Sequence, residues 1–115
     1  MTDERFTVQE RPEESRYVLL DREAADDRVV GEESYVDVET AKGVQRVLFH
    51  TGVVEDYGGR GLASLLVAEA VGDAVARGLA VVPVCPYVAK WLSKHPEYDG
   101  HVVKPRPEHL QAVPS

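Results

Sequence analysis

Cysteine and long apolar runs are scarce in this sequence. Cys85 is the only cysteine among 115 residues, so the chain has neither an intrachain disulfide nor a cysteine cluster for zinc. No apolar run approaches the length of a membrane-spanning helix, and residues 1–5 lack the basic start and apolar core of a signal peptide. These absences predict a cytoplasmic protein with no metal site and no membrane partner.

Basic residues are also few. The 13 Lys and Arg against 20 Asp and Glu give a net charge of −7, and residues 1–56 hold most of the acids, 15 against 7 basic side chains. A nucleic-acid partner is therefore not expected, because phosphates require a basic face. The acidic half either steers a cationic amine or only keeps strand faces and turns solvated.

One domain is predicted over residues 1–115, since a chain of this length with 43% hydrophobic residues suits a single core. Apolar runs bounded by turn residues predict an antiparallel meander with strands at 6–10, 16–21, 29–39 and 44–54. A helix over 61–77, a buried parallel strand over 79–84 and a short helix over 86–94 complete an α+β fold with a mixed sheet. Residues 1–4 and 104–115 are expected to be flexible tails.

The strand over 44–54 should be interior because both of its faces are apolar near the centre. Strict alternation predicts that Val47, Phe49, Thr51 and Val53 share one face. It places Leu48, His50 and Gly52 on the other face.

A glycine-rich loop, Tyr-Gly-Gly-Arg-Gly-Leu-Ala over residues 57–63, joins this strand to the long helix. Backbone N–H groups can converge in such a turn, and the helix behind it adds the positive end of its dipole. Leu62 and Ala63 stand where an ATP- or GTP-binding loop needs Lys and then Ser or Thr, and the glycine spacing does not fit a dinucleotide fingerprint. The loop therefore predicts a cradle for a different anionic ligand.

Four motifs follow one another along the chain: HTGV from His50, GGRGLA from Gly58, VVPVCPYV from Val81 and KHPEY from Lys94. This series resembles the small single-domain branch of the GNAT superfamily of acetyltransferases over about residues 5–103. Gly61 and Ala63 match the end of the family's pyrophosphate loop, Gln/Arg-x-x-Gly-x-Gly/Ala, and Gly58 departs from its first position. The resemblance implies a GNAT-like fold that binds acetyl-CoA or coenzyme A.

Coenzyme-binding positions follow from the same resemblance. They are Val53, Gly58, Gly59, Arg60, Gly61, Leu62, Ala63, Tyr87 and Lys90. Arg60 is expected to contact phosphate, with a solvated turn residue as the alternative. For Lys90 and Lys94 the alternatives are phosphate contact and a solvated helix face.

Cys85 and His50 are the candidate catalytic residues. Cys85 would be the N-cap of the short helix that begins at Pro86, where a thiolate is favoured, so it is either an acetyl acceptor or a small packing residue. His50 would accept a proton from an amine or from Cys85, unless it is a core histidine.

The usual acid and base of the superfamily are both replaced. Gly52 stands where relatives with the sequence HTEV carry Glu, and Leu92 stands where many members carry a Tyr. Glu55 is the nearest carboxylate, and Tyr87 or Tyr98 could substitute as the acid. Two hypotheses remain: an acetyl-CoA-dependent N-acetyltransferase acting on an unknown amine, and a non-catalytic acyl-CoA-binding or regulatory module. A purely structural interaction domain is disfavoured by the glycine loop.

Overall fold

The computed structural model describes residues 5–24 and 26–114. Within them, five strands form one sheet in chain order: β1 (Phe6–Arg11), β2 (Arg16–Asp21), β3 (Arg28–Thr40), β4 (Gly43–Val53) and β5 (Ala80–Pro83). The first four strands pair antiparallel, and β5 pairs parallel with β4. The predicted meander and crossover are confirmed, with strand ends that differ from the prediction by at most one residue.

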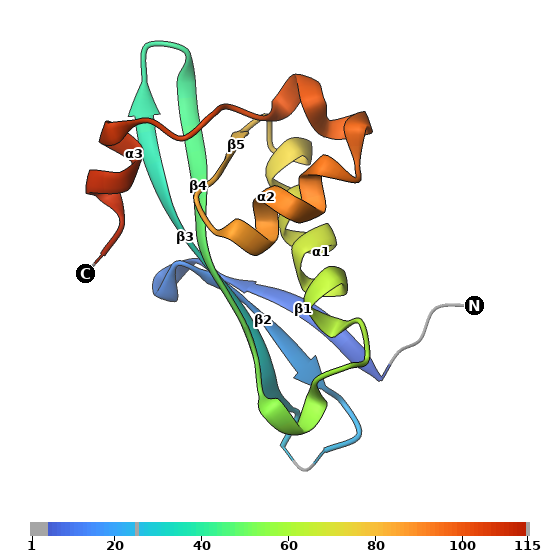
Figure 1. Cartoon of the computed structure of the whole chain (residues 1–115). Helices are drawn as coiled ribbons and strands as arrows, with labels where there is room; N and C mark the ends of the chain where they lie inside the picture. The colour runs from blue at the N-terminus through green and yellow to red at the C-terminus, as the bar shows by residue number, and fades with distance from the viewer. Residues whose placement is uncertain (1–4, 25, 115) are drawn as a thin grey trace.

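Two helices, α1 (Leu62–Ala76) and α2 (Pro86–Ser93), lie on the same face of the sheet (Figure 1). Helix α1 ends where predicted, because Gly78 adopts a φ of 76° and the N–H of Leu79 donates to the carbonyl of Ala74 at 2.9 Å. The buried side chains of α1 form the centre of the core: Leu62, Leu66, Val67, Ala70, Val71 and Ala74. Short 3-10 turns lie between the elements at Pro12–Glu14, Glu55–Tyr57 and Pro96–His101.

A β-bulge in β4 overturns the predicted assignment of its faces. The register passes from Ser34 opposite His50 to Tyr35 opposite Leu48, so Phe49 is an extra residue. Leu48 belongs to the core under α1, and beyond the bulge it is Thr51 that contacts Cys85 on this same face. The prediction that Leu48 and His50 share a face was wrong, because one inserted residue reverses the alternation.

The C-terminal segment is more ordered than predicted. Instead of a flexible tail, Pro107–Ala112 forms helix α3, on the side of the sheet away from α1 and α2 (Figure 1). His109 on α3 is 1% exposed, and its Nδ1 accepts the backbone N–H of Arg106 at 2.9 Å. Its other nitrogen, Nε2, therefore carries the proton and donates to Oε1 of Gln45 on β4 at 2.7 Å. The predicted tail at residues 1–4 lies outside the described residues.

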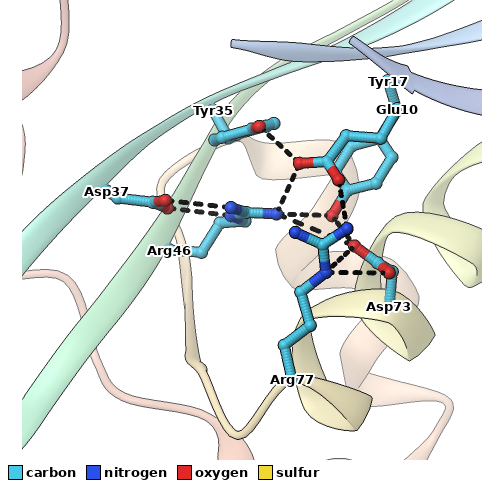
Figure 2. Close-up of polar contacts among 7 residues, drawn as sticks. All are labelled: Glu10, Tyr17, Tyr35, Asp37, Arg46, Asp73 and Arg77. Carbon is cyan, nitrogen blue, oxygen red and sulfur yellow. Dashed lines mark hydrogen bonds and ion pairs between the residues drawn. The ribbon is translucent and has the colours of Figure 1, made fainter. Parts of the chain in front are cut away.

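A buried arginine ties the C-terminal end of α1 to the sheet. The guanidinium of Arg46 on β4 lies 3.8 Å from the ring centre of Tyr35 and donates to the hydroxyl of Tyr17 at 2.7 Å. Figure 2 shows that Tyr17 lies in turn against Asp73 of α1, to which its hydroxyl donates at 2.6 Å. Burial raises the pKa of both tyrosines above their usual range, so their hydroxyls stay protonated. The remaining partners in this Arg46 cluster are Glu10, Asp37 and Arg77.

Candidate functional site

The candidate site lies where β4 and β5 part. Pairing between the two strands covers only Gln45–Leu48 and Ala80–Pro83, and the N–H groups of Val84 and Cys85 both donate to the carbonyl of Leu48, at 3.1 and 3.0 Å. The chain then turns into α2, whereas β4 continues to Val53. Beyond Leu48 the edge of β4 is therefore no longer paired with β5. The β-bulge at Phe49, in the pairing of β4 with β3, lies at the same point of β4.

The glycine loop connects the far end of β4 to α1. Gly59 and Gly61 adopt φ angles of 77° and 73°, which disfavour residues with a side chain, and an added Cβ at either position would meet no atom within 4 Å. Within the described part of the chain, no side chain caps the N-terminus of α1. The first N–H groups of this helix and the positive end of its dipole are therefore open to a ligand.

Tyr57 orders the side of the loop that carries Arg60. Its hydroxyl donates to Oδ2 of Asp21 at 2.7 Å, and the guanidinium of Arg60 lies 5.4 Å from its ring centre. Arg28 lies 5.6 Å from the same ring centre. The hydrogen bond from Arg5, followed by that from Tyr57, holds the pKa of the Asp21 carboxyl well below its usual range. Asp21 therefore stays charged and anchors the aromatic ring against which both arginines pack.

Cys85 begins a chain of two polar contacts that leads through Thr51 to Glu33. The thiol is 7% exposed at the N-cap of α2, and its Sγ lies 3.4 Å from Oγ1 of Thr51. The hydroxyl of Thr51 donates to Oε1 of Glu33, which lies directly opposite it on β3. Glu33 is fully buried, and within residues 5–24 and 26–114 its Oε2 has no hydrogen-bond partner. Burial raises the pKa of this carboxyl to about 8, although the Thr51 hydroxyl and the backbone of His50 oppose the rise.

The structure does not bring His50 to Cys85. His50 is exposed, and its Nε2 lies 3.1 Å from where a Cβ on Gly52 would be. His50 and Gly52 therefore share one face of β4, and Thr51, between them, points with Cys85 to the other. The bulge at Phe49 is the reason that the predicted pair is separated.

The other predicted residues divide between the loop and α2. Leu62 is buried and Ala63 is half-buried in the first turn of α1, behind the exposed glycines Gly58, Gly59 and Gly61. Val53 is half-buried against the core. On α2, Tyr87 is 40% exposed and Lys90 is exposed.

Two further observations limit the chemistry of the site. The side chain of Leu92, at the place of the usual tyrosine acid, is 5% exposed within the core. In the described ranges, no helix has both the length and the hydrophobicity needed to cross a membrane, and no three His, Cys, Asp or Glu side chains are grouped to hold a metal ion.

A family model described as GCN5-related N-acetyl-transferase matches residues 16–101. The chain belongs to this family. Transfer of an acetyl group to an amine is the reaction of the acetyltransferase family to which this domain belongs. The resemblance seen in the four sequence motifs is thereby confirmed at the level of the family.

Solved structures with the same fold have low sequence identity to this acetyltransferase domain. A GCN5-like protein of Staphylococcus aureus, solved by NMR, is 19% identical with a TM-score of 0.63 over 93% of this chain and 97% of that one. An aminoglycoside acetyltransferase from an uncultured soil sample is 13% identical with a TM-score of 0.51, over 72% of this chain and 55% of that one. No curated protein sequence matches this chain. The likeness to the solved structures concerns the fold.

Sequence reasoning missed Glu33 as a member of the site. The residue follows Glu32 in a strand whose acids were expected to face water. A weak signal was available, since two successive glutamates on a strand must point to opposite faces, and one of them then meets the core.

Proposed function

We propose that this domain binds acetyl-CoA, with the pyrophosphate on the Gly58–Ala63 loop and the thioester beside Cys85 where β4 and β5 part. The observation that supports this most directly is the uncapped N-terminus of α1 behind two glycines that leave the backbone open. The positive charges of Arg60 and Lys90 and the exposed ring of Tyr87 belong to the same proposed surface. A cytoplasmic location is part of this proposal.

When bound, acetyl-CoA supplies an activated acetyl thioester. The residues of the domain have three tasks in this scheme. The loop amides hold the diphosphate, and Val53 at the end of β4 borders the path from the loop to the thioester. Cys85 and Thr51 lie at the parting of the strands, where the acetyl group and the amine would meet.

A non-catalytic acyl-CoA-binding module is the second candidate. The observation in its favour is that Gly52 and the buried Leu92 replace the usual base and acid. Release of free coenzyme A in the presence of a panel of primary amines separates the two candidates, because a binding module retains acetyl-CoA without turnover.

Calorimetric titration with coenzyme A tests the loop. Gly61→Asp places a Cβ and a negative charge at the proposed phosphate position, and we expect affinity to fall by at least about tenfold. Gly78→Asp is the matched control, because Gly78 has nearly the same φ, 76° against 73°, and equally open space at the opposite end of α1. A folded Gly61→Asp variant with unchanged affinity would move the site elsewhere.

A further inference from the structure

The carboxyl of Glu33 is an unusual group to find in the core. It is fully buried beside Tyr17 on β2 and Thr51 on β4, and among the described residues no basic side chain pairs with it. In that part of the chain, its one hydrogen bond from a side chain comes from the Thr51 hydroxyl, which also contacts Cys85. A buried, half-satisfied carboxyl is costly, so a structural role alone does not account for it.

We propose that Glu33 is the proton acceptor of this site and that it acts on the Cys85 thiol through the Thr51 hydroxyl. The inference rests on the proposed function only in its choice of the acetyl thioester as the target of the thiolate. Glu33 touches no reacting atom and is therefore a positioning residue, whereas Cys85 is the nucleophile.

The proton step conserves charge. The S–H proton of Cys85 passes to Oγ1 of Thr51 while the Thr51 hydroxyl proton passes to Oε1 of Glu33. The negative charge thereby moves from the carboxylate to the sulfur. Sγ then bonds to the acetyl carbonyl carbon as the bond from that carbon to the coenzyme A sulfur breaks, and the departing sulfur takes the proton back from Glu33 along the same path.

The burial of Glu33 suits it to accept a proton. Burial raises the pKa of this carboxyl to about 8, so its carboxylate form is a stronger base than that of an exposed glutamate. The neighbouring Glu32 adds to the rise. Across β2, the Tyr17 hydroxyl is engaged with Asp73 and Arg46 and does not bond to Glu33.

Alkylation of the only cysteine by iodoacetamide, followed by mass spectrometry from pH 6 to 9, tests the relay without acetyl-CoA. We expect Glu33→Gln and Thr51→Val to lower the rate about tenfold at pH 9, where Glu33 of the wild type is ionised and can accept the proton, and Thr51→Ser to restore it to within about twofold of wild type. Glu39→Gln, on the same strand and exposed to solvent, is the matched control and should leave the rate unchanged.

An effect of Glu33→Gln on the alkylation rate in the opposite direction would overturn the proposal. If Glu33 were only a nearby negative charge, its removal would favour the thiolate, so an equal or faster rate in folded Glu33→Gln excludes the relay. The coenzyme A titration and the alkylation measurement test the two proposals separately. Acetyl-CoA binding with alkylation indifferent to Glu33 refutes the relay alone, and alkylation that depends on Glu33 without coenzyme A binding refutes the proposed function alone.

Discussion

The buried Glu33 carboxyl should make the stability of the fold fall as the pH rises. In the folded protein this group keeps its proton up to about pH 8, whereas in the unfolded chain it releases the proton near its usual pKa of 4.5. Between these values the native state binds more protons than the unfolded state. The free energy of unfolding therefore decreases with pH across this window.

The structure sets the size of the effect. The interval from 4.5 to about 8, at 1.36 kcal/mol per pH unit, corresponds to about 5 kcal/mol of stability lost from Glu33 by pH 8. This is an upper value, since any movement of the carboxyl toward water in the charged state reduces it. Glu33→Gln keeps the shape of the side chain and removes the titration. The free energy of unfolding of the variant, relative to that of wild type, should therefore increase as the pH rises.

Urea unfolding of both proteins at pH 5, 6, 7 and 8 measures this difference. All other titrating groups are common to the two proteins, so their contributions cancel in the comparison. Glu39→Gln, exposed on the same strand, serves as the control and should follow the wild-type curve. Parallel curves for Glu33→Gln and wild type would refute the reasoning, because they would mean that Glu33 titrates as an exposed carboxyl.

Three further predictions concern the loop, the Arg46 cluster and α3. Gly58 has a φ of −66°, which any residue adopts, and an added Cβ would lie 3.3 Å from the carbonyl oxygen of Glu55, so Gly58→Arg needs a small shift of the turn. The substitution should tighten coenzyme A binding by about 1 kcal/mol at low salt and less at high salt, and calorimetry that shows no gain at low salt contradicts this. Arg46→Met removes the arginine from Asp37 and from the Tyr17 hydroxyl, while Glu10 keeps Arg77 and Tyr35. It should cost about 3 kcal/mol in urea unfolding, and a loss below about 1 kcal/mol would mean that the cluster is dispensable. His109→Leu leaves Oε1 of Gln45 and the N–H of Arg106 unpaired, so α3 should detach. A glutamate-specific endoproteinase should then cleave after the exposed Glu108 faster than in wild type, and an unchanged rate contradicts this.

The order of the elements was readable from the sequence because each signal was local. Alternation in the strand over 29–39, the glycine after the helix and Pro86 at the start of α2 each act within a few residues. The open geometry of the glycine loop was predictable for the same reason. The ligand that it binds stays a prediction.

The pairing of side chains across the site could not be predicted from the sequence. The extra residue Phe49 has no local signature, since the bulge arises where β4 must pair with β3 and release β5. Because of this one extra residue, Thr51 rather than His50 is the neighbour of Cys85. The buried state of Glu33 depends equally on a partner 18 residues away and on the helices that cover it. The tail prediction failed because Pro107 suits the first turn of a helix as well as an extended chain.

Polar side chains gather around Arg46 and around Glu33 on the face of the sheet that α1 and α2 cover. The difference between the two groups indicates which of them has a functional role. In the Arg46 cluster, two arginines meet three carboxylates and two tyrosine hydroxyls, so each buried group has a partner and the arrangement serves the fold (Figure 2). Glu33 lies in the same row of the sheet, directly across from Tyr17, yet within the described residues it has one hydroxyl partner and one unpaired oxygen. The hydroxyl of Thr51 connects it to the cysteine of the chain, where β4 and β5 part. A fold that pairs the groups of the Arg46 cluster so fully has no structural need to leave the Glu33 carboxyl half-satisfied, and a proton-accepting role supplies the missing reason.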